Sequence, residues 1–261
     1  MMSAFLCDRL ANGAAALAQY GGGIAPVTAP DADPFDSGMW ELHRLEYLGD
    51  PPDWRADPRM RVLTPRNAED ASHVPIMIDA TGLTDPVTRI VVTIDYSPLP
   101  LALIFHPGRA LPLLGFGVKY EIAGPIRATA LADGVPARMG GAFIDAMGGG
   151  CSAPAVAHTR PDWQQGFGEM RGRLFPDSGR LRVNIRHPMD TGLADGIPAH
   201  HLTDLQLLDA QGATIARIEL RHPVEENPTL TFALPPDLAS GPVRIEARDS
   251  NGYRFSGEVR A

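Results

Sequence analysis

The residues with the clearest chemical potential lie in the stretch GGGCSAPA, where Gly148, Gly149 and Gly150 precede Cys151. A cysteine thiolate is a nucleophile that forms reversible bonds to sulfur, so it can hold a persulfide or a thiosulfonate. Glycine adds no side-chain bulk and leaves the backbone conformationally free. The pattern predicts an exposed thiol on a flexible glycine flank that other proteins can reach. A loop cysteine without function remains the alternative.

Few residues near Cys151 in the sequence could lower the pKa of its thiol. His158 and Arg160 are the nearest residues in the sequence that could carry a positive charge and activate the thiol. The only other cysteine, Cys7, lies far away in the N-terminal segment, and a disulfide between the two would close a very long loop. We therefore expect Cys151 to be a free thiol, whether or not the leader is cleaved.

Other candidate sites have weaker patterns. His187, His200 and His201 could ligate a metal, but their spacing matches no standard zinc pattern and no cysteine pair lies nearby. No serine lies in a nucleophile-elbow context, and the glycines at 21–23 do not join a strand to a helix. We expect histidines that pack or form hydrogen bonds, no metal site, no catalytic residues, no cofactor beyond a covalent sulfur adduct, and no enzymatic turnover.

Composition narrows the possible partners. The chain has 261 residues and a net charge of -8, and nearly all its basic residues are arginines without clustering. Binding to nucleic acid is therefore not expected. No apolar run reaches the roughly 18 residues of a membrane helix. Residues 1–34 resemble either a damaged or mis-started export signal or a disordered leader.

Short strands separated by turn residues dominate the rest of the sequence. Residues 36–53 predict a short helix, which Asp36 or Ser37 caps and in which Trp40, Leu42, Leu45 and Leu48 are spaced as an apolar face. Strands are expected at 73–80, 88–96, 101–107, 115–123, 126–134 and 139–149. Their spacing is typical of a β-sandwich covering residues 35–151.

A second strand series follows a linker at 152–168, which has few apolar residues and a short helix near Trp163. Strands are expected at 181–188, 204–223, 228–235 and 242–261. Asn251-Gly252 predicts a hairpin with a type I′ turn, and residues 210–212 predict another hairpin. The chain is thus expected to be all-β, with a second sandwich over residues 169–261. Trp163 is expected to pack at the seam between the two.

Several motifs resemble one known family. RHPMDTG (186–192), IPAHHL (197–202), EENPTLTFALP (225–235) and SGPVRIEARDSNGYRFSGEV (240–259) are similar to SoxZ, and AEDASHVPIMIDA (68–80) followed by GGGCSAPA is similar to SoxY. The chain therefore resembles a fused SoxYZ carrier of the type associated with quinoprotein (PQQ) dehydrogenases. In SoxY the cysteine lies beside a free C-terminus, whereas here the chain continues through Pro154 into a second domain.

The resemblance implies an immunoglobulin-like sandwich in each half, with the two halves packed together. It implies a periplasmic carrier of sulfur intermediates in thiosulfate-type oxidation, with Cys151 as the carrier residue. Its partners would be other Sox-type sulfur-oxidation enzymes or a quinoprotein dehydrogenase. A non-covalent accessory module for such a dehydrogenase, with Cys151 incidental, stays open as the alternative.

Overall fold

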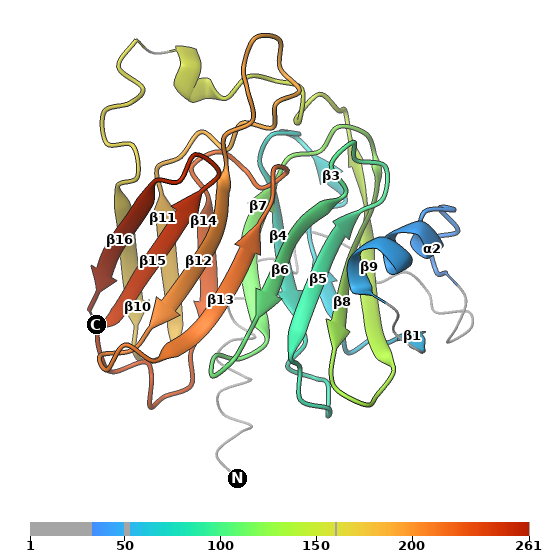
Figure 1. Cartoon of the computed structure of the whole chain (residues 1–261). Helices are drawn as coiled ribbons and strands as arrows, with labels where there is room; N and C mark the ends of the chain where they lie inside the picture. The colour runs from blue at the N-terminus through green and yellow to red at the C-terminus, as the bar shows by residue number, and fades with distance from the viewer. Residues whose placement is uncertain (1–32, 50–52, 160, 261) are drawn as a thin grey trace.

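The computed structural model describes residues 33–49, 53–159 and 161–260, and in this range the chain is nearly all β-structure (Figure 1). The helical segments are α2 (Trp40–His43), the π-helical turn η1 (Arg44–Leu48) and the 3-10 turn η2 (Val156–Thr159). The N-terminal half contains β1 (Trp54–Ala56), β2 (Arg61–Leu63), β3 (Asn67–Ala68), β4 (Val74–Asp79), β5 (Arg89–Ile94), β6 (Leu101–His106), β7 (Leu113–Val118), β8 (Gly124–Leu131) and β9 (Ala137–Ala146). The C-terminal half contains β10 (Met170–Phe175), β11 (Arg180–Ile185), β12 (Leu202–Leu208), β13 (Thr214–Leu220), β14 (Thr229–Ala233), β15 (Val243–Asp249) and β16 (Arg254–Val259).

The strands form two sheets, and each sheet runs through both halves of the chain. The larger has the order β1-β9-β8-β5-β6-β13-β12-β15-β16, with β3 also paired to β9, and the smaller has the order β10-β11-β14-β7-β4-β2. The two sheets face each other as the layers of a sandwich (Figure 1). The predicted fold class, all-β with two immunoglobulin-like sandwich domains, is confirmed.

The two domains join by strand pairing rather than by side chains alone. In the larger sheet β6 pairs antiparallel with β13, where Phe105 lies opposite Ile218. In the smaller sheet β7 pairs with β14, where Leu114 lies opposite Phe232. The expectation that the halves pack together is therefore confirmed, and backbone hydrogen bonds continue across the seam in both layers.

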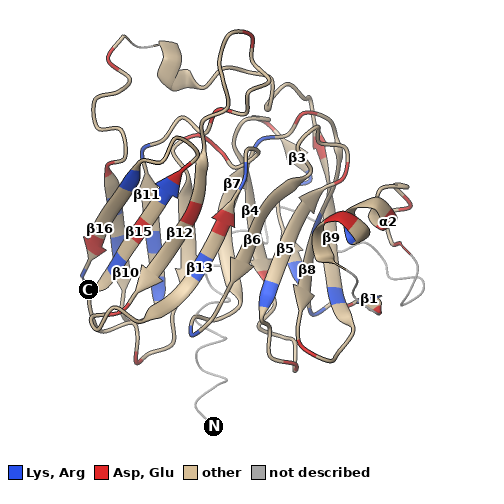
Figure 2. Cartoon of the chain, in the orientation of Figure 1, with Lys and Arg blue, Asp and Glu red and all other residues tan. Residues whose placement is uncertain are grey.

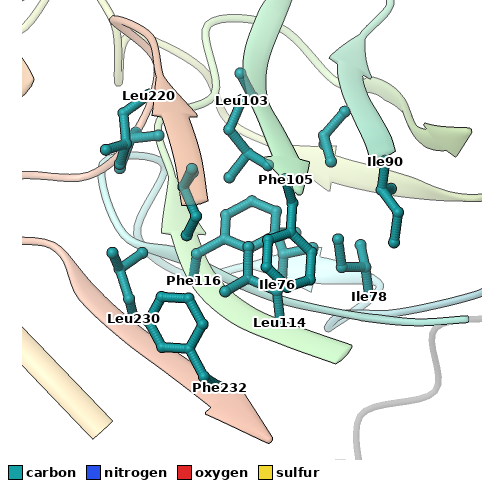
Figure 3. Close-up of a cluster of buried hydrophobic side chains, with 14 of the residues drawn as sticks. Ile76, Ile78, Ile90, Leu103, Phe105, Leu114, Phe116, Leu220, Leu230 and Phe232 are labelled. Atoms are coloured by element: carbon teal, nitrogen blue, oxygen red, sulfur yellow. The ribbon is translucent and has the colours of Figure 1, made fainter. Parts of the chain in front are cut away.

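The core is continuous between the halves for the same reason. The side chains of Phe105 and Phe232 come from different halves, and their ring centroids lie 6.2 Å apart in an edge-to-face arrangement. Figure 3 shows these rings among Leu103, Leu114 and Phe116 in one cluster. Residues of β15 alternate strictly between buried and exposed, which is how a strand with one face on a core reads in sequence.

Two hairpins of the C-terminal half share one turn chemistry. The predicted hairpin at Asn251-Gly252 forms between β15 and β16, but its turn is not type I′, because only Gly252 of the pair has a positive φ (88°). The Oδ1 atom of Asp249 accepts hydrogen bonds from the backbone N–H groups of Asn251 and Tyr253 and so builds a wider loop. Asp209 does the same in the hairpin between β12 and β13.

The N-terminal helical segment is shorter and differently oriented than its sequence predicts. Trp40 and Leu48 are buried as expected, whereas Leu42 and Leu45 are exposed. Leu42 follows Trp40 by two residues and so lies about 200° around the helix from that buried side chain, and Leu45 lies in the wider turn η1 that follows α2. No side chain caps α2 directly.

A buried arginine attaches this segment to the sheet. The guanidinium of Arg127, on β8, is fully buried and donates to the carboxylates of Asp95 and Asp33 and to the hydroxyl of Ser37. Burial alone would raise the pKa of Asp95, but its interactions with His43 and Arg127 hold that pKa below its usual range. A paired and hydrogen-bonded charge of this kind is tolerated in a protein interior.

Charges elsewhere are mixed. In Figure 2 acidic and basic residues are interspersed along the strands rather than separated by sign. Among the described residues, no helix is both long and apolar enough to span a membrane. Residues 1–32 of the predicted leader, including Cys7, and Arg160 lie outside the described residues, whereas Asp33, near the end of that leader, is paired with Arg127.

Candidate functional site

Cys151 lies just beyond the last strand of the N-terminal half. After β9 ends at Ala146, the backbone turns through Gly148 and Gly149, whose φ values of 90° and 81° are unfavourable for other residues. The chain then passes Cys151 and runs over the edge of the sandwich towards η2 (Figure 1). We call residues 147–155 the cysteine arm.

The thiol of Cys151 is fully buried, and the prediction of an exposed cysteine is wrong for this conformation. Its exposed fraction is 0%, and the sulfur lies 3.5 Å from the backbone oxygen of Lys119. Burial raises the pKa of the thiol to about 11, and the negative charge of Glu121 adds to the rise while Lys119 opposes it. The thiol is therefore protonated and shielded at neutral pH. Ser152 beside it is exposed, so the arm itself is a thin surface segment.

The flanking glycines are packed rather than free. A Cβ atom on Gly150 would lie 2.1 Å from the backbone oxygen of Ala71, so no larger residue fits there. The backbone N–H groups of Gly149 and Gly150 donate to the carbonyl oxygens of Glu121 and Tyr120, at 3.2 and 2.8 Å. In this conformation the glycine flank forms a hydrogen-bonded turn, because glycine permits positive φ and close backbone contact, and its flexibility stays a prediction.

One carboxylate holds the arm in place. Glu121 Oε2 accepts hydrogen bonds from the backbone N–H groups of Cys151 and Ser152, both at 3.0 Å, and Oε1 accepts one from the Ser152 hydroxyl at 2.8 Å. Three donors from two neighbouring residues converge on one side chain, which we call the Glu121 latch. Because hydrogen bonds to a charged acceptor are stronger than neutral ones, the latch stabilises the closed position of the arm.

The C-terminal half completes the enclosure. The hydroxyl of Thr191 donates to the carbonyl oxygen of Cys151 at 2.5 Å. The ammonium group of Lys119 donates to the carbonyl oxygen of Met189 at 2.6 Å. Residues from both halves therefore surround the thiol, and the loop that starts with the RHPMDTG motif forms one wall.

Lys119 is the charged residue that the sequence reasoning missed. It is only 3% exposed, and burial lowers the pKa of its side chain, opposed by the charges of Asp190, Cys151 and Glu226. It lies 32 residues before Cys151, so proximity in sequence could not reveal it. One sequence signal could have: Lys119 is the only lysine in the chain.

His158, one of the two candidates for a positive charge near the thiol, has another partner. Its Nε2 lies 2.9 Å from both carboxylate oxygens of Asp190, and its ring packs edge-on against Trp163. The carboxylate of Glu226 accepts hydrogen bonds from the backbone N–H groups of Val156 and Ala157. The segment after the arm is thereby fastened to the C-terminal half, and Trp163 packs within it.

The three histidines considered as metal ligands, and expected to pack or form hydrogen bonds instead, lie only partly together. His187 and His200 lie beside Asp249 with their potential ligand atoms within 4.8 Å of one another, whereas His201 packs instead on His222 at 3.8 Å between ring centroids. The backbone N–H of Met189 donates to Nδ1 of His187, so the proton of the neutral ring is on Nε2, which faces Asp249 at 3.6 Å. A nitrogen that carries a proton has no lone pair for a metal. The geometry favours a buried carboxylate bordered by two imidazole rings.

A shallow depression of about 730 Å³ lies over the latch. Its lining includes Glu121 and Ser152 together with the exposed apolar side chains of Tyr96, Ile122 and Leu193. The segment that covers the thiol thus forms part of the floor of a partly apolar hollow. A protein that contacts this hollow would touch the latch directly.

Comparisons with known proteins agree with this geometry. The family model described as "Sulfur oxidation protein SoxY" matches residues 44–151, so its match ends at the cysteine itself. The model described as "Sulphur oxidation protein SoxZ" matches residues 175–260. A search of curated proteins finds no match.

Solved structures give only a distant likeness. A β-glycosidase from Bacteroides vulgatus matches 77% of this chain and 24% of its own, at 12% identity and a TM-score of 0.25. A glycosyl hydrolase family 2 member from Bacteroides cellulosilyticus DSM 14838 matches 72% of this chain and 24% of its own, at 10% identity and a TM-score of 0.18. The chain spans about a quarter of the length of these proteins. With a SoxY domain and a SoxZ domain covering most of its length, the chain belongs to the sulfur-oxidation carrier family as a fused SoxYZ-type protein.

Proposed function

We propose that the protein carries sulfur intermediates covalently on Cys151 and that the conformation described above is its closed, resting state. The observation that carries the proposal is the position of Cys151, at the end of the SoxY match and at the seam with the SoxZ domain. In the closed state the protonated, buried thiol is protected from oxidation. Function then requires the cysteine arm to swing out.

The contacts of the arm suit such a motion. Polar interactions hold it to the surface, namely the Glu121 latch and the Thr191 hydroxyl, and Ser152, Ala153 and Pro154 are exposed. Segments that open reversibly are generally held by few buried apolar contacts. Once outside, the thiol loses the desolvation that raises its pKa, and a larger fraction becomes thiolate. Opening would expose and activate the nucleophile in one step.

Loading from a persulfide donor then needs no oxidant. The Cys151 thiolate attacks the outer sulfur of the donor R–S–SH, a new S–S bond forms, and R–S⁻ leaves with the electron pair of the broken bond. The product is the persulfide of Cys151. We infer that enzymes of sulfur oxidation in the periplasm load and unload the carrier, that they dock on the hollow over the latch, and that the carrier has no turnover of its own.

Burial of the thiol favours a second candidate as well. A non-covalent accessory module for a quinoprotein dehydrogenase would need no reactive cysteine, and a thiol with a pKa raised to about 11 suits a packing role. In that case the hollow beside Tyr96 would bind the dehydrogenase directly, and Cys151→Ala would leave dehydrogenase activity unchanged.

Intact-mass spectrometry of the protein isolated from its native host tests the carrier function. We expect adducts that increase in steps of about 32 Da, the mass of a sulfur atom, and their loss in Cys151→Ser. Glu121→Gln serves as a matched variant that keeps the thiol. A wild-type protein isolated during growth on thiosulfate with an unmodified Cys151, together with full function of Cys151→Ser, would refute the proposal.

A further inference from the structure

The chain uses lysine once and places it beside its functional cysteine. All other basic residues with permanent charge are arginines, and Lys119 directly follows β7, at the edge where the two domains meet. Its backbone oxygen contacts the sulfur of Cys151, and its side chain is buried. A charged residue is rarely buried without a partner, so this one needs an explanation.

The contacts of Lys119 in the described part of the chain compensate only part of its buried positive charge. In the described part of the chain, the hydrogen bond of its ammonium group goes to the uncharged carbonyl oxygen of Met189, at 2.6 Å. The charges that act on it are those of Asp190, Glu226 and Cys151. Asp190 and Glu226 already interact with His158 and with the backbone of η2. Since an ammonium group has three N–H donors, Lys119 retains the capacity to serve another acceptor.

Lysine suits this position better than arginine would. Its ammonium is a compact point charge on an unbranched stem, whereas guanidinium is a planar group with five donors that favours two-point binding. A single compact positive charge is sufficient to pair with a small anion at the end of the cysteine side chain.

On the basis of the proposed carrier function, we propose that Lys119 is the counter-ion of loaded Cys151. Its ammonium group attracts the anionic terminal sulfur of the carried persulfide and so offsets part of the burial cost, and of the repulsion by the Glu121 carboxylate, that oppose closure of the arm on the loaded carrier. Lys119 therefore matters for closure on the loaded carrier and little for closure on the empty one.

The difference follows from charge. The empty thiol is neutral at pH 7, because burial raises its pKa to about 11, so its attraction to the ammonium is small. A persulfide is a stronger acid than the corresponding thiol and ionises more readily. An ion pair in a partly shielded site is stronger than in water, and the desolvation of its charges offsets part of that gain. We expect the charge of Lys119 to favour closure on the loaded form about tenfold more than closure on the empty form.

Thiol labelling of loaded and empty protein tests this preference. Cys151 is loaded with a small organic persulfide, and the rate of reaction with monobromobimane is compared in the wild type and in Lys119→Met. The substitution should accelerate labelling of the loaded form about tenfold more than that of the empty form. The empty protein is the internal control, because mere loosening of the arm would accelerate both forms equally. Lys119→Arg, which keeps the charge, should restore part of the preference.

A second measurement needs no cargo. Cys151→Asp places a fixed anion at the end of the arm, and Cys151→Asn is its uncharged match. Hydrogen exchange of the amides of residues 151 and 152 reports on opening, since both bond to Glu121. Lys119→Met should reduce protection about tenfold more in the Asp variant than in the Asn variant.

The outcomes separate the two proposals. Equal effects of Lys119→Met on the Asp and Asn variants, or on loaded and empty protein, would overturn the role of Lys119 and leave the carrier function intact. Failure of the wild type to accept sulfur on Cys151 would overturn the carrier function. The comparison of the Asp and Asn variants would then still show whether Lys119 stabilises an anion at position 151.

Discussion

Removal of the Glu121 latch gives the most direct test of an opening arm. Glu121→Ala deletes the acceptor of three hydrogen bonds, two from backbone N–H groups and one from the Ser152 hydroxyl. The donors lie near the surface, so water replaces part of what is lost, and we take a net loss of about 2 kcal/mol for the three. Since about 1.4 kcal/mol corresponds to a tenfold change, the open fraction should rise about 30-fold.

The assay is the rate at which a thiol reagent labels Cys151 in the folded protein. If labelling proceeds only through the open state, the rate is proportional to the open fraction, and Glu121→Ala should accelerate it about 30-fold. Glu246→Ala, which removes an exposed acidic residue of β15, is the matched control and should have no effect.

Two effects of Glu121 must be separated. Its charge also raises the pKa of the thiol, so its removal could increase the thiolate fraction without any opening. An opening effect multiplies the rate by the same factor across pH, whereas an effect on acidity displaces the pH profile. Labelling of Glu121→Ala at the wild-type rate, with both proteins fully labelled after denaturation, would refute the latch.

Three further predictions follow from the packing. Gly150→Ala should accelerate labelling and destabilise the protein by about 2 kcal/mol, because its Cβ would meet the carbonyl oxygen of Ala71 at 2.1 Å. Gly149→Ala has open space around its Cβ but a positive φ, so it should destabilise the protein by about 1 kcal/mol. Equal melting temperatures of the two variants would contradict this prediction. The free energy of unfolding should fall as pH decreases from about 6.5 towards 4, by up to about 1.4 kcal/mol per pH unit for each of two histidines. Burial lowers the pKa of His187 to about 3 and that of His201 to about 4, so in this pH range only the unfolded chain binds these protons. Urea titrations at pH 7 and 5 measure the change, and His201→Asn should flatten the slope. Proteolytic nicking between residues 161 and 165 should leave the two halves in one peak on gel filtration, because both sheets are hydrogen-bonded across the seam, and two separate peaks would disprove this.

The sequence predicts most of the strands because they depend on local patterns, but it misses the short strands β1, β2 and β3 and the edge strand β10. Alternating residues in β15 and the turn residues at Gly212 and Gly252 are read directly from neighbouring positions. The pairing of β6 with β13 was not predicted, since it joins residues more than a hundred positions apart and no local pattern specifies a partner strand.

In the candidate site, too, local sequence predicts some features, and others depend on residues that only the fold brings together. The glycine-flanked Cys151 identifies itself by composition, but its burial depends on the carboxylate of Glu121, the hydroxyl of Thr191 and the backbone at Ala71, which only the fold brings together. Glycine allows a flexible tether and an unusually close contact equally well. The sequence cannot decide between them, and here close contact prevails.

Because Lys119 is the chain's only lysine and is buried, reagents that acylate amines have no exposed lysine to attack. Cross-linkers built on activated esters would therefore find no lysine side chain on the described faces of this protein, even in a tight complex. Carbodiimide coupling through its acidic residues is the better route to capture whatever binds it. Conversely, Lys119 can be acylated only when the segment that covers it moves away, so its acylation rate would measure how often that movement occurs.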